Sequence, residues 1–205
     1  MDFTLEKLEK RTRELEAFRY VNLQDISPMQ MMEAPEVEDG IHRQPPQTVQ
    51  GRELCTGDFL SGWDQYWWCQ KVLELPARRR GLTPVGIFDF GNTGHGNNDG
   101  FEGLLYLDSH PYQGVDANHR DVVFSPEWAG KTVNLQLLLW SGLQGGGAPK
   151  TQYHQARRMQ VGYLHEDTDA LYYFFKAIYK TLKLVPESDG NYYALLDAAD
   201  RALAI

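Results

Sequence analysis

The spacing of apolar residues predicts helices near both ends of the chain. From Thr4 to about Tyr20 they recur with the period of a helix, roughly 3.6 residues, along one stripe of Leu5, Leu8, Leu15 and Phe18, with Thr12 at the missing position. A second stripe follows Asp167 and comprises Leu171, Phe174, Phe175, Ile178, Leu182 and Val185. Beyond residues 186–190, which form a turn, the third stripe contains Tyr192, Leu195, Leu196, Ala199 and Leu203. These patterns predict an N-terminal helix and a C-terminal helical hairpin.

The ends of the two C-terminal helices are marked differently. Asp167 or Thr168 can cap the first, and Asp189 or Asn191 can cap the second, because short polar side chains accept hydrogen bonds from the first N–H groups of a helix. The second helix runs to Ile205 without a glycine, proline or basic residue to end it. A helix whose last carbonyls lack partners is interrupted rather than complete. We therefore expect this chain to be part of a longer protein.

Between residues 47 and 165 the pattern changes to the two-residue alternation of β-strands. It is clearest from Thr132 to Trp140, where every second residue is apolar: Val133, Leu135, Leu137 and Leu139. Short apolar runs separated by turn residues predict about eight strands in all, among them 85–90, 104–108, 112–116, 121–124 and 159–163. The preceding stretch, to Pro46, reads as a loop with at most one short strand.

This spacing predicts a mainly β fold, an antiparallel β-sandwich or jelly roll of the galactose-binding-domain-like type. We expect the N-terminal helix in residues 1–25, the sandwich in 26–166 and a helical linker in 167–205. One strand, from Trp63 to Leu75, is apolar on both faces. Since a strand of this kind is covered on both sides, we expect the core on one side and a helix or a partner domain on the other.

Composition and charge exclude several classes of protein. The 28 acidic and 20 basic residues give a net charge of −8, which argues against a nucleic-acid-binding groove. No stretch approaches the roughly 20 apolar residues that span a bilayer, and the charged N-terminus is not a secretory signal. Cys55 and Cys69 are too few for a disulfide framework. We expect both to be reduced thiols, buried in strands of a cytoplasmic protein.

No motif for metal or phosphate chemistry stands out. The six histidines never lie within four residues of one another, so the sequence predicts no metal site in this chain. The glycine- and asparagine-rich loop from Asp89 to Gly100 lacks the lysine of a phosphate-binding loop and the acids of a calcium loop. Its glycines suit a long connection between strands. A loop of this length also commonly lies over a cleft or an interface.

The carboxylates and tryptophans of the chain allow two hypotheses that involve carbohydrate. A glycosidase pair can be drawn from Asp89, Asp99, Glu102 or Asp116, but such a pair is defined by the distance between its carboxylates. A sugar-stacking platform can be drawn from Trp63, Trp128 or Trp140. In a chain in which 12% of the residues are aromatic, the core or an interface is the commoner location for such residues.

Two consecutive stretches are similar to a known family. Residues 89–108 read DFGNTGHGNNDGFEGLLYLD, and residues 111–122 read PYQGVDANHRDV. Both closely resemble the amino-terminal domain of bacterial and vacuolar-type α-mannosidases of glycoside hydrolase family 38. The resemblance extends to EAFRY at 16–20, WDQYWW at 63–68 and DTDALYYF at 167–174.

The resemblance implies a jelly-roll domain and a helical linker that precede a catalytic domain. In the family, that later domain hydrolyses α-mannosides with retention, using a zinc ion and an aspartate nucleophile, and its zinc motif begins His-x-His-x-Asp. Here the nearest match is Ala117-Asn118-His119-Arg120-Asp121, with alanine in place of the first histidine. No catalytic residue or zinc ligand is therefore carried over to this chain, and zinc is expected in the catalytic domain of the parent enzyme.

These points together predict a non-catalytic accessory domain of an α-mannosidase. Its expected partners are the catalytic domain of the same polypeptide, a further copy of the chain, and carbohydrate. The residues expected at the substrate rim or at an interface are Asn97, Asn98, Asp116, Asn118, His119 and Trp63. Two alternatives stay open: a free-standing carbohydrate-binding module, and an element that serves only packing or oligomerisation.

Overall fold

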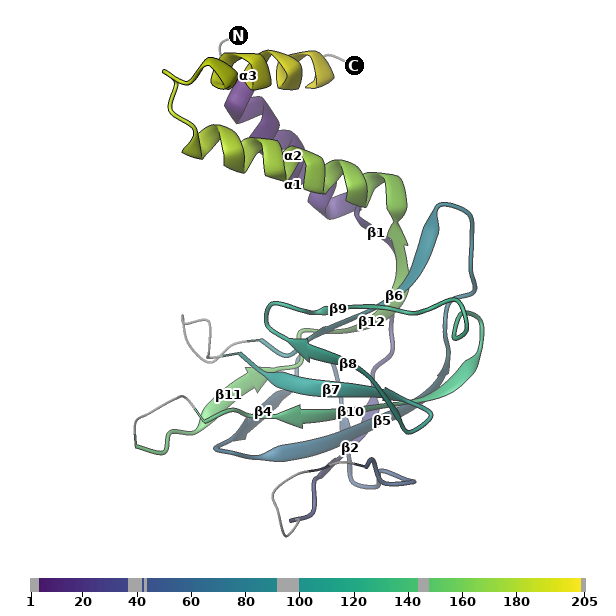
Figure 1. Cartoon of the computed structure of the whole chain (residues 1–205). Helices are drawn as coiled ribbons and strands as arrows, with labels where there is room; N and C mark the ends of the chain where they lie inside the picture. The colour runs from purple at the N-terminus through teal and green to yellow at the C-terminus, as the bar shows by residue number, and fades with distance from the viewer. Residues whose placement is uncertain (1–3, 37–41, 43, 92–99, 144–147, 204–205) are drawn as a thin grey trace. The chain divides into compact units, whose positions relative to one another are not determined.

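The fold is described from a computed structural model (Figure 1). It describes residues 4–36, 42, 44–91, 100–143 and 148–203. These form three helices and twelve strands in the order α1 (Thr4–Phe18), β1 (Tyr20–Asp25), β2 (Met29–Glu33), β3 (Arg52–Leu54), β4 (Phe59–Gly62), β5 (Tyr66–Glu74), β6 (Leu82–Asp89), β7 (Glu102–Leu107), β8 (His110–Asp116), β9 (Asp121–Val123), β10 (Thr132–Trp140), β11 (Gln152–Gln155), β12 (Arg158–His165), α2 (Glu166–Leu184) and α3 (Gly190–Leu203).

The chain divides into two compact units. A helical unit contains Met1–Val21, Arg79–Thr83 and Leu164–Ile205, and a β unit contains Asn22–Arg78 and Pro84–Tyr163. Strands β1, β6 and β12 each run from one unit into the other. The helical unit is therefore assembled from three separate stretches of sequence.

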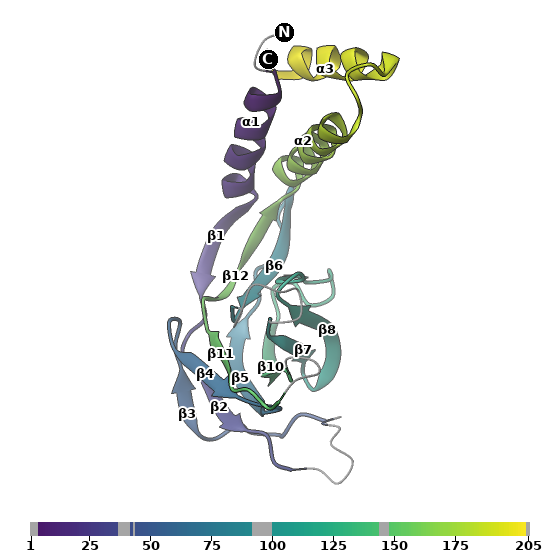
Figure 2. The same cartoon turned by 90° about the vertical axis from the view of Figure 1, so that its left-hand side faces the viewer.

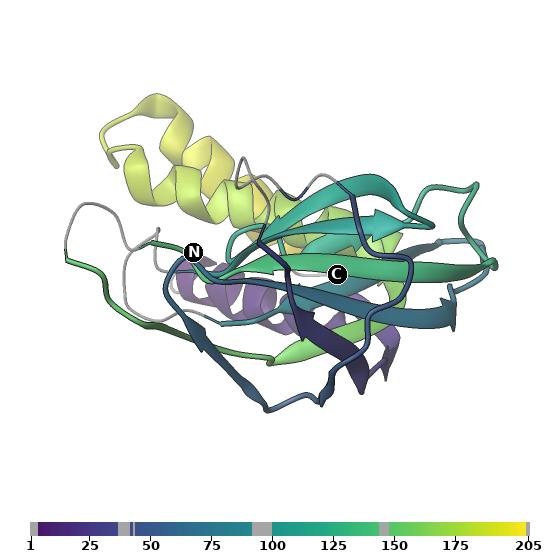
Figure 3. The same ribbon diagram turned by 90° about the horizontal axis from the view of Figure 1, so that it is seen from below.

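The β unit is built mainly from antiparallel strands, as the sequence predicts. One sheet has the strand order β3-β2-β5-β10-β7-β8, and another has the order β1-β12-β6-β9. In the larger sheet, β10 pairs antiparallel with β5 and with β7, and these strands lie side by side in Figures 2 and 3. A single apolar cluster takes side chains from both sheets, including Leu135 and Leu137 of β10, Phe88 of β6 and Met159 of β12. Alternation along β10 thus places the core between the sheets.

Several strand boundaries differ from the sequence predictions. The region from residue 47 to 165 contains more strands than the eight expected, because β3, β4 and β11 have only three or four residues each. A segment this short carries too little alternation to be recognised. Strand β5 begins at Tyr66 rather than at Trp63, and α1 ends at Phe18, so that Tyr20 opens β1. Among the described residues between Ser27 and Pro46, β2 is the one short strand that the sequence allows.

Residues 46–49 of the chain itself cover part of the second apolar face of β5, whereas Val72 on that face is 63% exposed. Trp68 on this face is 2% exposed and packs in a small cluster with Val49, Tyr106 and Leu138. Three hydrogen bonds hold this covering segment in place. In the longest of them, Nε2 of Gln70 donates to the carbonyl of Gln47 at 3.3 Å. The backbone N–H of Val49 donates to Oε1 of Gln70 at 2.7 Å, and Nε2 of Gln136 donates to the carbonyl of Pro46 at 2.7 Å.

The helical unit has its own apolar core. Its buried members come from all three helices: Leu8, Phe175, Leu182, Tyr192, Leu196 and Ala199. Three predicted core residues are instead exposed, Phe18 by 67%, Phe174 by 68% and Leu171 by 42%. The apolar stripes are therefore wider than the surface that the neighbouring helices cover.

One predicted helix cap is wrong and one is confirmed. Helix α2 begins earlier than expected, and its cap is His165, whose Nδ1 accepts from the backbone N–H of Thr168 at 3.3 Å. Asp189 lies at the start of α3 as predicted, where its Oδ1 accepts from the N–H of Asn191 at 2.8 Å. No helix in the part of the chain that the structure describes is long and apolar enough to cross a membrane.

The two cysteines differ in their environment. Cys69 is buried in β5, and burial raises the pKa of its thiol to about 12. Cys55 is only half-buried and follows the end of β3, which corrects the prediction that both thiols are buried in strands. Both are free thiols, so neither position contributes a disulfide to the fold.

Candidate functional site

A row of polar and aromatic side chains crosses one end of the six-stranded sheet. Tyr66 of β5 lies opposite Trp140 of β10, Trp140 lies opposite Glu102 of β7, and Glu102 lies opposite Asp116 of β8. Directly opposed residues of an antiparallel pair project from the same face of the sheet. Because neighbouring strands are about 4.8 Å apart, the row extends over about 14 Å. We call these four residues the sheet-end row.

The two aromatic members of the row form a stacked pair. The rings of Tyr66 and Trp140 have centroids 6.0 Å apart and an interplanar angle of 19°, and the ring of His42 lies 4.7 Å from that of Tyr66. The indole N–H of Trp140 donates to Oδ1 of Asp64 at 2.8 Å. Burial, and then the negative charges of Asp64 and Glu102, raise the pKa of Tyr66. Acidic side chains therefore surround a half-buried aromatic pair.

The turn that carries Asp64 is fixed to the end of β10. The N–H of Gln65 donates to Oγ of Ser141 at 2.9 Å, and the N–H of Ser141 donates to the carbonyl of Gln65 at 2.9 Å. The N–H of Asp64 donates to the carbonyl of Gly142 at 3.2 Å. Asp64 itself has φ of 52°, a left-handed conformation that aspartate tolerates better than most residues. These bonds hold the Asp64 carboxylate where it accepts from the indole.

Asp116 organises a tight turn at the other end of the row. Its Oδ1 accepts from the backbone N–H groups of Asn118 at 2.6 Å and of His119 at 2.7 Å. The Nδ1 of His119 lies 3.0 Å from Oδ2 of Asp116. Burial alone raises the pKa of Asp116, but the hydrogen bonds from His119 and Asn118 outweigh it and lower the pKa. His119 is exposed.

The hydrogen bonds of Asp116 in this turn predict that the free energy of unfolding decreases slightly at acidic pH. Since the pKa of Asp116 is lower in the folded state than its ordinary value of about 3.9, the carboxylate stabilises the fold above that pH. The contribution is lost as the pH falls through the lowered pKa. We expect Asp116→Asn to reduce the free energy of unfolding at about pH 7 by at most about 1 kcal/mol, because the side chain is partly exposed. The difference should shrink towards about pH 3, as measured by urea unfolding with circular dichroism.

The control for this measurement is Glu53→Gln, which removes an exposed carboxylate from β3. It should change the unfolding free energy little at either pH. A difference between wild type and Asp116→Asn that grows as the solution becomes more acidic would contradict the assignment.

The residues predicted for the site have different outcomes. Asp116 belongs to the sheet-end row, and Asn118 and His119 lie beside it in the same turn. Trp63, 45% exposed, precedes Asp64 in the turn at the other end of the row. Asn97 and Asn98 lie outside the described residues.

At the start of the loop that contains them, a buried aspartate pairs with a partly exposed arginine. Asp89, which is 5% exposed, accepts from the N–H of Gly91 at 2.8 Å, and its Oδ2 lies 3.0 Å from NH1 of Arg120. The described residues contain no group of three or more histidine, cysteine or acidic side chains that could hold a metal ion.

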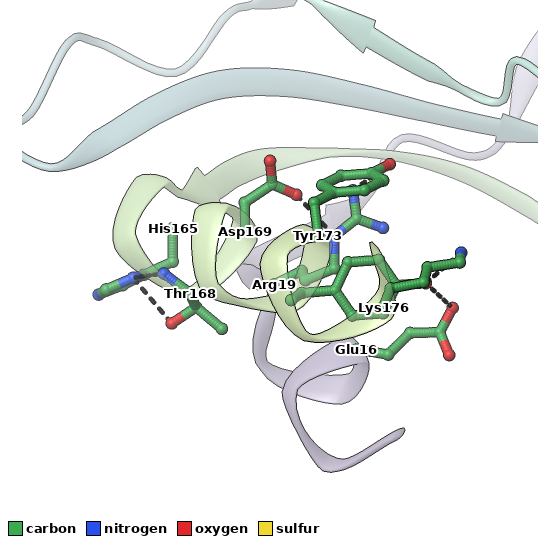
Figure 4. A network of polar contacts seen from close by, with 8 residues as sticks. Glu16, Arg19, His165, Thr168, Asp169, Tyr173 and Lys176 are labelled. Atoms are coloured by element: carbon green, nitrogen blue, oxygen red, sulfur yellow. Dashed lines mark hydrogen bonds and ion pairs between the residues drawn. The ribbon is translucent and has the colours of Figure 1, made fainter. Parts of the chain in front are cut away.

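A second polar network, in the helical unit, was not predicted (Figure 4). Arg19, which follows α1 and is 8% exposed, donates from Nε to Oδ1 of Asp169 in α2 at 2.6 Å. Its guanidinium carbon lies 4.7 Å from the ring centroid of Tyr172 and 5.0 Å from that of Tyr173. Burial opposes the charge, but the hydrogen bond to Asp169 raises the pKa of Arg19. The guanidinium is therefore charged and fixes α1 to α2.

The same network extends one turn further along both helices. The hydroxyl of Tyr172 donates to Oε1 of Glu16 at 3.1 Å, and Nζ of Lys176 donates to the Tyr172 hydroxyl at 2.7 Å. The contacts join side chains of α1 to side chains of α2. They account for the network as a structural element of the helical unit.

No family model matches the chain, and no curated protein matches it.

Proposed function

We propose that this chain is a non-catalytic accessory domain of an α-mannosidase of glycoside hydrolase family 38. The motif at residues 89–122 suggests the family. The structural observation that carries the proposal is an apolar groove in the helical unit. An accessory domain needs such a surface to dock on the catalytic domain of its own polypeptide, which would hold the zinc ion and the aspartate nucleophile.

The groove has a volume of about 620 Å³ and is lined mainly by Leu15, Phe18, Leu171 and Phe175. Phe18 and Leu171 are 67% and 42% exposed. Grouped apolar side chains left in contact with water mark protein interaction sites more often than isolated ones. The groove therefore suits the docking of a further domain.

Hydrolysis of an aryl α-mannoside tests the proposal. Under it, the complete gene product that contains these residues hydrolyses the substrate in a zinc-dependent manner, and the 205-residue chain alone does not. Turnover by the isolated chain would refute an accessory role. Absence of turnover by the complete gene product would refute the α-mannosidase assignment.

If the groove docks on a catalytic domain, a substitution in the groove should destabilise the complete enzyme more than the chain alone. Leu171→Asp places a charge in the groove, at a position of α2 that is 42% exposed. We expect it to lower the temperature at which the complete enzyme loses activity by about 4–8 °C, which corresponds to about 2 kcal/mol for a domain of this size. The melting temperature of the 205-residue chain should change much less.

Tyr193→Asp, at a 53% exposed position of α3, is the matched control and should affect neither measurement strongly. If Leu171→Asp lowers both temperatures equally, the groove serves only the internal packing of the helical unit.

A free-standing carbohydrate-binding module is the second candidate. The observation that favours it is the sheet-end row, in which a stacked tyrosine and tryptophan lie beside carboxylates. Saccharide binding without α-mannosidase activity in the complete gene product would favour this candidate over the first.

Two further proposals concern location and assembly. We propose a cytoplasmic location, supported by the two unpaired thiols. We also propose that the apolar groove allows association of two copies when the catalytic domain is absent. Light scattering of the chain alone and of the complete gene product compares their oligomeric states.

A further inference from the structure

We propose that the sheet-end row is a binding site for a neutral saccharide. Pyranose rings would stack on Trp140 and Tyr66, and their hydroxyl groups would donate to Glu102 and Asp116. The inference assigns a ligand class to specific residues and does not depend on the α-mannosidase assignment.

The aromatic pair supplies a platform of suitable chemistry. A pyranose ring has an apolar face of C–H groups and a rim of hydroxyls, and aromatic rings with one wet side are suited to the former. Tyr66 and Trp140 come from neighbouring strands, and their planes differ by only 19°. A row of about 14 Å is long enough for consecutive sugar units to contact both the rings and the carboxylates.

The carboxylates retain capacity to accept hydrogen bonds from hydroxyls. An ionised carboxylate has about four acceptor positions. Glu102 is exposed, and its side-chain carboxylate makes no hydrogen bond or ion pair among the described residues. Asp116 uses its acceptor positions in part for the N–H groups of its own turn. Hydrogen bonds to charged acceptors are roughly twice as strong as neutral ones, so these two residues give orientation and affinity.

The site is organised before any ligand arrives. The indole of Trp140 is oriented by its bond to Asp64, and Asp64 is positioned by the bonds that fix its turn to Ser141 and Gly142. At the other end, backbone N–H groups hold the Asp116 carboxylate. A binding site whose side chains are already ordered loses less conformational entropy on binding.

A cationic ligand is the main competing class, because cations bind aromatic faces flanked by carboxylates. The neutral saccharide is favoured because two of the three carboxylates near the rings already have hydrogen-bond donors. The carboxylate of Asp64 already accepts from an indole N–H, and that of Asp116 accepts from two backbone N–H groups and contacts His119. Glu102 is the member of the row whose charge has no such partner among the described residues. The row thus offers hydrogen-bond acceptors more than uncompensated charge.

The experiment is an NMR titration of the 205-residue chain, with mannobiose, maltose, cellobiose and tetramethylammonium as separate probes. We expect a disaccharide to shift the indole N–H of Trp140 and the amides of the row at millimolar concentration. Glu102→Gln should weaken that binding about tenfold, since it removes a charged acceptor. Trp140→Phe keeps an aromatic ring but loses the bond to Asp64, and should weaken binding as well.

Tyr193→Ala is the control, because it removes an exposed aromatic side chain from the helical unit. It should leave saccharide binding unchanged. Should Trp140→Phe fail to fold, Glu102→Gln at its exposed position still decides the question.

The inference is overturned if none of the disaccharides shifts the row, if only tetramethylammonium does, or if Glu102→Gln binds as wild type does. The aryl α-mannoside assay is separate, so its failure and the failure of saccharide binding are distinguishable.

Discussion

Replacing Arg19 with alanine should destabilise the helical unit by about 3–5 kcal/mol, the usual effect of removing one partner from a buried ion pair. Arg19 is 8% exposed and its Nε lies 2.6 Å from Oδ1 of Asp169. Its loss leaves the Asp169 carboxylate without its cation and removes the contacts with the rings of Tyr172 and Tyr173. The α1 helix is then held by its apolar contacts and by the hydrogen bonds of Glu16 with Tyr172 and of Thr4 with Asp200.

Thermal unfolding followed by the helical circular dichroism signal measures this effect. Arg13→Ala, at an exposed position of the same helix, is the matched control and should be nearly neutral. A double-mutant cycle with Asp169→Asn isolates the energy of the pair. If Arg19→Ala and Arg13→Ala unfold at the same temperature, the network does not fix α1 to α2.

Leu137→Ala should reduce the free energy of unfolding of the β unit by about 2–5 kcal/mol. Leu137 is fully buried, and so are its partners on both neighbouring strands, Cys69 in β5 and Leu105 in β7. With sheets packed on both sides of this cluster, the cavity has little opportunity to collapse, and lost packing adds to lost burial.

Urea unfolding provides the measurement, with Val72→Ala as the control. Val72 lies on β5 and is 63% exposed, so its truncation should cost less than about 1 kcal/mol. Equal destabilisation by the two substitutions would mean that β10 is not at the centre of the core.

Long, regular elements could be predicted from sequence, whereas short ones could not. The bounds of β10, Thr132–Trp140, agree with the sequence prediction because polar and apolar residues alternate from Thr132 to Leu137 and the apolar run then continues to Trp140. In β11 only four residues are available, and the hydrogen bonds of β4 rather than any periodicity define the strand. The covering of Trp68 by the segment around Val49 also depends on tertiary contacts. The pattern of apolar residues within a single strand does not predict such contacts.

The candidate site shows the same division. Asp116 and His119 could be found in the sequence because they are three positions apart in one turn. Tyr66, Trp140 and Glu102 are distant in sequence and become neighbours only through the register of β5, β10 and β7. Periodicity assigns a residue to a face of a sheet but does not say which residue lies opposite it.

The discontinuous helical unit has a consequence for synthesis in the cell. Arg19 and Asp169 are 150 positions apart, and a ribosome adding about 5–20 residues per second needs roughly 8–30 s to travel between them. During that interval α1 has emerged, but the helices that complete its core have not been made. Helix α1 is therefore translated well before its native contacts can form, and Leu8 lacks the side chains of α2 and α3 that bury it until those helices have been made.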